Sequence, residues 1–270
     1  MIANILSIAG SDPSGGAGIQ ADLKTFAARG TYGMAVLTAL TAQNTQGVTG
    51  VHTVPPSFVT QQIKAIFADV RVDAVKIGMI ASGEIAEAVA DIVGAHASIP
   101  IVLDPVMVAK GGHTLLPEEA IDAMKRCLLP LATLITPNLP EAAALLGTPE
   151  ASDRHVMAMQ AEQLRSLGPR MALVKGGHLD SPESPDVLAD NSGTHWFEAR
   201  RMNTRNTHGT GCTLSSAIAA ELGKGKCPRE AVDGAKQYLA RAVERAHELH
   251  VGSGHGPVNH FVDIFPAGRL

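Results

Sequence analysis

The sequence has few aromatic residues and few cysteines for its length. Aromatic side chains make up 3% of the 270 residues, which is too few for the stacking platforms that bind single-stranded nucleic acids. The three cysteines, Cys127, Cys212 and Cys227, are scattered along the chain, which argues against a disulfide framework or a zinc site. Unpaired cysteines fit a reducing compartment, and we expect a cytoplasmic protein.

The sequence also lacks an excess of positive charge and any long apolar run. The formal net charge is −4 and no basic block is present, so we expect no nucleic-acid partner and no binding to a membrane surface. No apolar run reaches the length of a membrane span, and Met1–Asn4 carry no basic segment of an export signal. Hydrophobic residues are 45% and charged residues 18%, as in a globular protein with a substantial core.

The chain is organised around a glycine-rich turn late in the sequence. Residues 203–216 read N-T-R-N-T-H-G-T-G-C-T-L-S-S, and small and apolar residues follow. A glycine-rich turn that leads into a helix leaves backbone N–H groups without partners at the positive end of the helix dipole. Phosphate commonly binds there. The turn therefore predicts an anion site at Gly209–Gly211, with Cys212 in the first helical turn, where a thiol pKa is usually lowered.

Two better-known phosphate-binding motifs do not match this turn. A P-loop requires Lys and then Ser or Thr after its last glycine, whereas Cys212 and Thr213 follow Gly211. A dinucleotide-binding fingerprint requires a third glycine three residues after the second, and Leu214 stands there. The turn is a candidate phosphate site of another kind, and a loop that only reverses the chain is the alternative.

Short apolar runs alternate with helical patterns along most of the chain. We predict strands at 5–9, 34–43, 48–54, 74–77, 101–103, 134–135 and 171–174, and an antiparallel hairpin at 187–197. Helices are predicted at 19–30, 58–67, 84–93, 117–128, 140–146, 157–167, 217–222 and 231–249. This alternation indicates an α/β fold with a mainly parallel central sheet and helices on both faces. No break divides the pattern, so we expect a single domain over residues 1–270.

Candidate ligand-binding residues follow the predicted strands, at the sheet edge where ligands bind in such folds. They are Asp12, Gln43, Met79, Asp104, Asn138, Glu141 and Lys175, with the turn at Gly209–Cys212. Each alone is an ordinary turn or surface residue, but their repetition at one edge predicts a site. Asp104 and Glu141 are hard oxygen ligands suited to Mg²⁺. Lys175 and the backbone donors of the turn would neutralise phosphate groups, so the set favours phosphoryl transfer.

Gln43 and Asp22 predict a heteroaromatic ligand. The amide of Gln43 can make two opposed hydrogen bonds to a ring edge, and the carboxylate of Asp22 can accept one from an exocyclic amine. Asp22 lies within the first predicted helix, where a solvated carboxylate is the alternative interpretation.

These residues lie in motifs that resemble those of the ribokinase-like superfamily of small-molecule kinases. The marks of that superfamily are a late G-T-G-[DC] turn and an N-x-x-E motif, here Gly209–Cys212 and Asn138–Glu141. Within it, the sequence is similar from end to end to the bacterial hydroxymethylpyrimidine/phosphomethylpyrimidine kinases of thiamine biosynthesis. The motifs are A-G-S-D-P-S-G-G-A-G-I-Q-A-D (9–22), T-A-x-x-A-Q-N-T (38–45), K-I-G-M (76–79), V-L-D-P-V-M (102–107), T-P-N-L-P-E-A (136–142), K-G-G-H (175–178) and N-T-H-G-T-G-C-T-L-S (206–215).

The resemblance implies a three-layer ribokinase-like sandwich and two ATP-dependent steps. The hydroxymethyl group of 4-amino-5-hydroxymethyl-2-methylpyrimidine is phosphorylated first, and the monophosphate is then converted to the diphosphate. A homodimer is expected only from the family.

The resemblance also assigns site residues by position. Gln43 is expected to hold the pyrimidine, in a pocket shaped by Gly10, Asp22, Met79 and Val106. Asp104 and Glu141 are expected to serve Mg²⁺, with Asn138 beside them. Lys175 and Thr210 are expected to bind the ATP phosphates, and Gly209, Thr210 and Gly211 to form an anion hole.

Cys212 departs from the wider superfamily, in which an aspartate general base is usual, and agrees with the pyrimidine-kinase branch. We expect it at the reaction centre and hypothesise that its thiolate takes the hydroxyl proton. Since a thiolate is a weak base for an alcohol, a role through shape and polarity is the alternative. The loop at 110–114 is a candidate lid, or a flexible surface connection.

Two other functions are open at this point. A pyridoxal kinase also phosphorylates a hydroxymethyl group on a heteroaromatic ring, but pyridoxal has no amine to pair with Asp22 and Gln43. A non-catalytic vitamin-binding protein of the same fold is the second, and the intact set of Asp104, Glu141, Lys175 and Cys212 argues against it.

Overall fold

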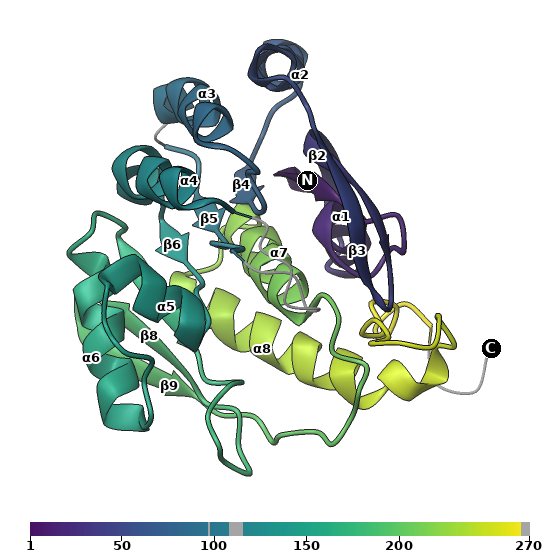
Figure 1. The fold of residues 1–270 in the computed structure, drawn as a ribbon, viewed down its shortest axis with the longest axis vertical. Helices are drawn as coiled ribbons and strands as arrows, with labels where there is room; N and C mark the ends of the chain where they lie inside the picture. Colours follow the sequence, from purple (N-terminus) through teal and green to yellow (C-terminus); the bar gives the residue numbers. More distant parts are fainter. Residues whose placement is uncertain (97, 108–115, 266–270) are drawn as a thin grey trace.

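One sheet runs through the molecule, with helices packed on both of its faces (Figure 1). The computed structural model describes residues 1–96, 98–107 and 116–265. Within these ranges nine strands form the sheet, in the order β3-β2-β1-β4-β5-β6-β7-β8-β9. They are β1 (Asn4–Ser11), β2 (Tyr32–Asn44), β3 (Gly47–Thr53), β4 (Ala74–Ile77), β5 (Ile101–Leu103), β6 (Leu134–Ile135), β7 (Met171–Lys175), β8 (Asp186–Asp190) and β9 (Gly193–Phe197).

The six central strands are parallel, and the antiparallel strands lie at the two ends of the sheet. β2, β1, β4, β5, β6 and β7 pair in parallel. β3 pairs antiparallel with β2, and β8 and β9 extend the other end as an antiparallel hairpin. The strands at the middle of the sheet, β4, β5 and β6, are short apolar runs because helices bury them on both sides. Every residue of β4, β5 and β6 is buried.

The helices form two layers that enclose two separate apolar cores. One face is covered by α2 (Pro56–Asp69), α3 (Gly83–Val93), α4 (Glu118–Ala123), α5 (Leu139–Leu146) and α6 (Arg154–Arg165). The other face is covered by α1 (Gly18–Ala28), α7 (Thr210–Gly223) and α8 (Pro228–Glu244). Figure 1 shows α7 running beneath the middle of the sheet, where it packs against β1, β4 and β5. This places the first turn of α7 close to the sheet edge where the candidate residues gather.

The predicted α/β sandwich is confirmed, and the differences are at element ends. The helix predicted at 117–128 is α4 followed by a π-turn, Met124–Leu128, and a 3-10 turn, Leu129–Leu131. Pro130 has no backbone N–H to continue the α-helical pattern. The helix predicted at 231–249 ends at Glu244, and a 3-10 turn, Ala246–Glu248, follows. The candidate lid at 110–114 lies outside the described residues.

The segment after α8 returns toward the site. The amide of His255 donates to the carbonyl of Thr45, and the amide of His208 donates to the carbonyl of Gly256. The segment therefore ties the tip of the β2–β3 hairpin to the turn before α7, and Figure 1 shows it in yellow beside that hairpin. None of the helices in the described ranges has the length and apolar character that crossing a bilayer requires.

Candidate active site

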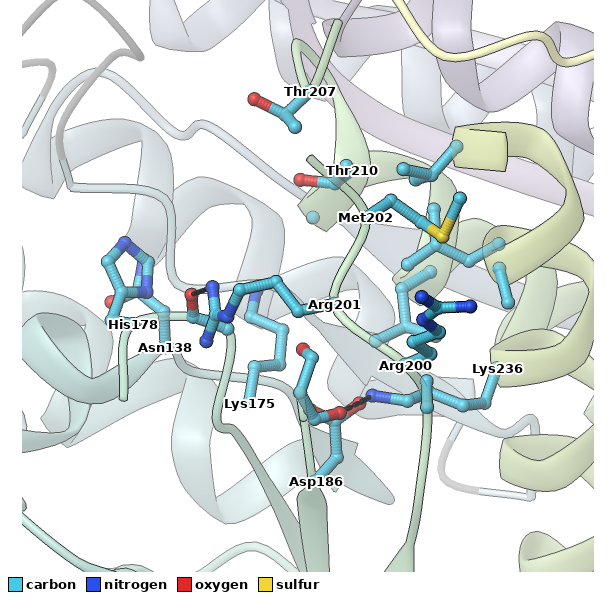
Figure 2. Close-up of a pocket in the computed structure, with 18 residues that line it drawn as sticks. Asn138, Lys175, His178, Asp186, Arg200, Arg201, Met202, Thr207, Thr210 and Lys236 are labelled. Atoms are coloured by element: carbon cyan, nitrogen blue, oxygen red, sulfur yellow. Dashed lines mark hydrogen bonds and ion pairs between the residues drawn. The ribbon is translucent and has the colours of Figure 1, made fainter. Parts of the chain in front are cut away.

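Two adjoining cavities open at the carboxyl ends of the central strands. The larger, of about 540 Å³, is lined on one side by residues that follow β1, β2 and β4 and on the other by the turn before α7. The smaller, of about 320 Å³, lies between β7–β8 and α8 (Figure 2). Both cavities are lined by Asn138, Lys175, His178, Thr207, Thr210 and Gly211. A group held at this shared wall is reachable from both sides, as transfer between two bound molecules requires.

The turn before α7 is an anion site by geometry. Gly209 is the N-cap of α7 with φ of 79°, which favours glycine. A Cβ at Gly209 would lie 1.8 Å from the carbonyl oxygen of Gly16, so the two glycine-rich loops touch here. Among the described residues, the amide N–H groups of Gly211 and Cys212 make no hydrogen bond to a backbone carbonyl that precedes α7. These donors sit at the positive end of a 14-residue helix, where an anion is stabilised.

Lys175 and two carboxylates meet at the shared wall. The Nζ of Lys175, at the end of β7, lies 3.1 Å from Oδ1 of Asp104 and 4.0 Å from Oε2 of Glu141. Thr136 and Ser215 also donate to Asp104, at 3.2 and 3.3 Å. A Cβ at Gly211 would lie 3.3 Å from Nζ of Lys175, which places the cation beside the anion turn.

Asn138 and Glu141 have a structural role in addition to their place at the cavity. The amide oxygen of Asn138 accepts from the N–H of Glu141, and Oε2 of Glu141 accepts from the N–H of Asn138. This reciprocal capping box fixes the start of α5. The backbone of Met107 is a further hydrogen-bond donor to the Glu141 carboxylate.

Burial and neighbouring charges shift the pKa values of Glu141 and Lys175. Burial raises the pKa of Glu141 to about 7, with Lys175 opposing the shift and Asp104 adding to it. For Lys175, burial alone would lower the pKa, but Asp104 and Glu141 raise it above its ordinary value. The lysine is therefore a permanent cation at the shared wall.

Cys212 lies in the first turn of α7 and lines the larger cavity. Burial raises the pKa of its thiol to about 11, and the nearby charge of Lys76 offsets only part of that shift. The prediction of a lowered pKa is therefore wrong for the protein without ligands, because burial and the carboxylates of Asp22 and Asp104 outweigh the charge of Lys76 and the hydrogen bond from the backbone of Gly18.

Asp22 is the one predicted pocket residue that the structure does not place on the cavity. Its carboxylate is fully buried and both oxygens lie 2.9 Å from Nζ of Lys76. Ser7 and Ser216 also donate to it, at 2.6 and 2.7 Å. Since these donors occupy its acceptor sites, Asp22 does not accept from a ligand amine, and the predicted contact is corrected. Asp22 instead neutralises Lys76, which lines the cavity.

The other predicted pocket residues do line the larger cavity. Gly10, Gln43, Met79 and Val106 all contribute to its wall. A Cβ at Gly10 would lie 2.3 Å from Cε of Met79, so the glycine makes room for the methionine. The pocket is thus mainly apolar, with a few polar groups that can orient a ring.

Sequence reasoning missed several residues that the structure brings to the site. His208 lies beside Asp12 in the larger cavity, and Lys76 reaches it from β4. In the smaller cavity, Lys236 of α8 pairs with Asp186, which accepts from the amide of Gly176 (Figure 2). His208 directly precedes the anion turn, and Lys76 interrupts an apolar strand. The position of His208 before the anion turn and the charge of Lys76 within an apolar strand could have identified both residues.

In the described part of the chain, no three His, Cys, Asp or Glu side chains group as a ready-made metal cage. Mg²⁺ is usually held by one or two carboxylates together with phosphate and water. The residues that fit this pattern are Asp104 and Glu141.

The parallel sheet, the anion turn at a helix start and the lysine–carboxylate cluster define a small-molecule kinase of ribokinase-like fold. Comparison with known proteins agrees. A model of the phosphomethylpyrimidine kinase family matches residues 12–259. A hydroxymethylpyrimidine/phosphomethylpyrimidine kinase of Salmonella typhimurium is 52% identical over 258 residues, which are 96% of this chain and 97% of that protein.

Solved structures place the chain among the same kinases. A pyridoxal kinase of Bacillus subtilis, in complex with ADP, superposes with a TM-score of 0.88 at 35% identity, over 97% of this chain and 98% of that one. A phosphomethylpyrimidine kinase of Clostridium difficile has a TM-score of 0.79 at 43% identity, over 89% and 99%. The chain belongs to the phosphomethylpyrimidine kinase family, and the predicted family and kinase class are confirmed.

Proposed function

We propose that this protein transfers the γ-phosphoryl group of ATP to the hydroxymethyl group of 4-amino-5-hydroxymethyl-2-methylpyrimidine, and then phosphorylates the monophosphate to the diphosphate. The observation that carries the proposal is the shared wall of Lys175 and the anion turn, with one cavity on each side. The larger cavity takes the pyrimidine against Gln43, and the smaller takes the nucleotide.

The smaller cavity suits a nucleotide by its chemistry. The cavity is lined by Met202 and by apolar side chains of α8, Leu239, Ala240 and Val243, and Arg200 supplies positive charge. A flat base can lie between the apolar groups. Its phosphates would then extend toward Thr210 and Lys175, at the wall common to both cavities.

The protein contributes positioning and charge to the reaction. Lys175 and the N–H groups of Gly211 and Cys212 would hold the transferring group, with the anion hole completed by Gly209 and Thr210. Such preorganised donors stabilise the charge of the transition state. Mg²⁺ would be held by Asp104 and Glu141, with Asn138 beside them, and it would neutralise part of the polyphosphate charge.

Cys212 lies where the attacking hydroxyl group is expected, and we propose that it contacts this group. Because its pKa is raised to about 11, Cys212 carries a thiol and not a thiolate at neutral pH in the protein without ligands. A proton would therefore leave the hydroxyl late in a loose transition state, as phosphoryl transfer allows. Near-full turnover of both steps by Cys212→Ala would show that neither this contact nor a general-base role of Cys212 is needed.

A pyridoxal kinase is the second candidate, favoured by the TM-score of 0.88. The identity of 52% to a pyrimidine kinase, against 35% to that pyridoxal kinase, supports the first. Asp22 does not help to distinguish a pyrimidine kinase from a pyridoxal kinase, because it does not line the larger cavity. The distinction now rests on Gln43, whose amide pairs with the ring-nitrogen and amine edge of an aminopyrimidine.

We also propose a single domain over residues 1–270, a homodimer and a cytoplasmic location. One sheet spans most of the chain and the family model covers residues 12–259, which supports the single domain. Cys127, Cys212 and Cys227 are all free, which fits a reducing compartment. Size-exclusion chromatography with light scattering tests the dimer.

Steady-state kinetics tests the proposed function directly. The protein should form ADP and pyrimidine monophosphate from Mg²⁺-ATP and hydroxymethylpyrimidine, and Gln43→Ala should raise KM for the pyrimidine by roughly tenfold because two ring contacts are lost. ATP turnover without a phosphorylated pyrimidine would contradict the proposal and favour a sensing protein.

A further inference from the structure

The loop between β7 and β8, residues 176–185, forms part of the wall of both cavities. Gly177 lines the smaller cavity, and His178 lines both. The loop begins directly after Lys175, so its shape decides how the wall of the smaller cavity continues beyond that cation. No residue of the loop takes part in the proposed transfer of phosphate.

The two ends of this loop are held together. The amide of Gly176 donates to Oδ1 of Asp186 at 3.0 Å, and a Cβ at Gly176 would lie 2.0 Å from the carbonyl oxygen of Pro185. Nζ of Lys236 donates to Oδ2 of Asp186 at 2.5 Å and to the carbonyl of Ser184 at 2.7 Å (Figure 2). The base of the loop is therefore fixed by Lys236, whose charge Asp186 neutralises.

The body of the loop folds around the guanidinium of Arg201. Nη1 of Arg201 donates to the carbonyl of Gly177 at 2.8 Å, and Nε donates to that of Ser181 at 2.7 Å. Nη2 donates to the carbonyls of Leu179 at 2.7 Å and Glu183 at 3.3 Å. Four carbonyls of alternate residues thus converge on one side chain and use four of its five N–H donors.

These contacts fix the guanidinium without neutralising it. All four acceptors are backbone carbonyls and none is a carboxylate, so the positive charge of Arg201 is only partly compensated by their dipoles. Arg201 also lines the smaller cavity, as Figure 2 shows. It differs in this from Lys236, which has a carboxylate partner.

The backbone of Arg201 connects the loop with the opposite wall of the smaller cavity. Its amide donates to the carbonyl of Pro182 at 3.1 Å. The chain then continues through Met202 and Thr207, which line the same cavity, to the anion turn at Gly209. One residue therefore ties the β7–β8 loop to the segment that leads into the phosphate site.

We propose that Arg201 is a positioning residue that holds the β7–β8 loop in the shape that binds the nucleotide. The inference rests on the proposed assignment of the smaller cavity to the nucleotide and deepens it. Without the guanidinium, the four carbonyls lose their donor and the loop can open. Their oxygens carry partial negative charge, so a loop that turns them toward the cavity would repel the phosphates.

Direct binding of Mg²⁺-ADP to the whole protein, measured by isothermal titration calorimetry, tests this role. We expect Arg201→Ala to raise Kd for ADP about tenfold and KM for ATP by a similar factor, because several charged-donor bonds are lost. The turnover number and KM for the pyrimidine should change less than about threefold, because the larger cavity keeps its wall.

Arg165→Ala is the matched control. Arg165, on α6, also donates to a backbone carbonyl, that of Arg170 at 3.3 Å, but it lines neither cavity. Its replacement should leave Kd for ADP within about twofold of the wild-type value, as is usual for a surface substitution.

Added guanidinium separates a missing donor from a disturbed fold. Millimolar guanidinium chloride can supply the planar donor that Arg201→Ala lacks, so Kd for ADP should fall by at least about threefold toward the wild-type value. Sodium chloride at the same concentration should not have this effect, and guanidinium should not change the affinity of Arg165→Ala. Arg201→Lys keeps the charge but not the planar fork, so it should still bind ADP at least about threefold more weakly than the wild type.

Each result bears on one of the two proposals. A Kd for Arg201→Ala within about twofold of the wild type, absence of rescue by guanidinium, or wild-type affinity in Arg201→Lys overturns the positioning role. An equal rise in KM for the pyrimidine does so too, because it would show that the whole site is disturbed. Wild-type protein that binds ADP but phosphorylates no pyrimidine contradicts the proposed function, and the calorimetric test of Arg201 still applies. If melting curves show that Arg201→Ala is unfolded at the assay temperature, Arg201→Lys carries the test.

Discussion

The ammonium of Lys175 lies 3.1 Å from a carboxylate oxygen of Asp104, at the wall that joins the two cavities. The lysine comes from the end of β7 and the aspartate follows β5, so two strands that are not neighbours in the sheet meet at one point. This pair places a permanent cation between the proposed nucleotide and acceptor sites.

Replacement of Lys175 should therefore impair the chemical step more than substrate binding. We expect Lys175→Met to lower kcat by about 10²- to 10³-fold, the usual effect of removing one preorganised charge donor. KM for the pyrimidine should change much less, and steady-state kinetics measures both. Lys226→Met is the control, because Lys226 is an exposed lysine in the turn after α7, which ends at Gly223. Lys175→Met with more than a tenth of the wild-type kcat would contradict this role.

Two glycine-to-alanine substitutions should have opposite effects on stability. Gly209→Ala places a Cβ 1.8 Å from a carbonyl oxygen in a backbone with φ of 79°, so it should unfold at a lower denaturant concentration and lose activity. Gly234→Ala lies within α8 with nothing inside 4 Å of the new Cβ, so it should stabilise by roughly 0.5–1 kcal/mol. Urea unfolding measures both, and equal shifts for the two variants would show that the close contact at Gly209 is unimportant.

The thiol of Cys212 should react slowly at neutral pH although it faces a cavity. Its pKa of about 11 leaves fewer than about one thiol in a thousand ionised at pH 7.5. Alkylation with iodoacetamide, followed by peptide mass spectrometry, should modify the exposed Cys227 first. The rate at Cys212 should rise about tenfold per pH unit up to its pKa. Faster labelling of Cys212 than of Cys227 at pH 7.5 would show that its pKa is lowered instead.

Stability should fall on acidification partly through His260. Burial lowers the pKa of His260 to about 3, and its Nε2 lies 3.1 Å from the hydroxyl oxygen of Thr213 in the first turn of α7. The unfolded chain, with an ordinary histidine pKa, binds the proton below about pH 6.5, whereas the folded protein does not. This stabilisation is present above pH 6.5 and is lost as the pH falls toward 3, by up to about 1.4 kcal/mol per pH unit.

His260→Gln isolates that contribution from the other histidines. The free energy of unfolding of this variant, from urea titrations, should fall less between pH 7 and pH 5 than that of the wild type. Parallel pH profiles for the two proteins would mean that His260 is already protonated in the folded state or does not titrate differently on unfolding.

The elements of the fold could be predicted because the buried strands are short apolar runs. The strands at 74–77, 101–103 and 134–135 were predicted residue for residue. Helix starts were predicted late where the first turn is polar. α6 begins at Arg154 behind the capping side chain of Asp153, three residues before its apolar pattern begins.

The position of the site at one edge of the sheet could also be predicted, because the carboxyl ends of parallel strands must lie together. Asp104, Glu141, Lys175 and the Gly209–Cys212 turn do gather there. The burial of Asp22 was missed, although Ile19, Asp22 and Phe26 lie on one helix face and all three are buried. A charged residue on an apolar face requires a buried partner, and Lys76 within an apolar strand is that partner.

The pKa of Cys212 could not be predicted from its place at a helix start. Lys76 and a hydrogen bond from the backbone of Gly18 lower it, whereas burial and the carboxylates of Asp22 and Asp104 raise it. These groups come from α1, β4 and the end of β5, so their sum depends on the packed structure.

The most direct test of the account is mass-resolved product formation from a mixture. The protein is incubated with Mg²⁺-ATP and equal amounts of hydroxymethylpyrimidine and pyridoxal. The account predicts pyrimidine monophosphate first and pyrimidine diphosphate after it, with pyridoxal phosphate as a minor product at most. Pyridoxal phosphate alone would contradict the assignment of the larger cavity while leaving the fold and the phosphate site in place.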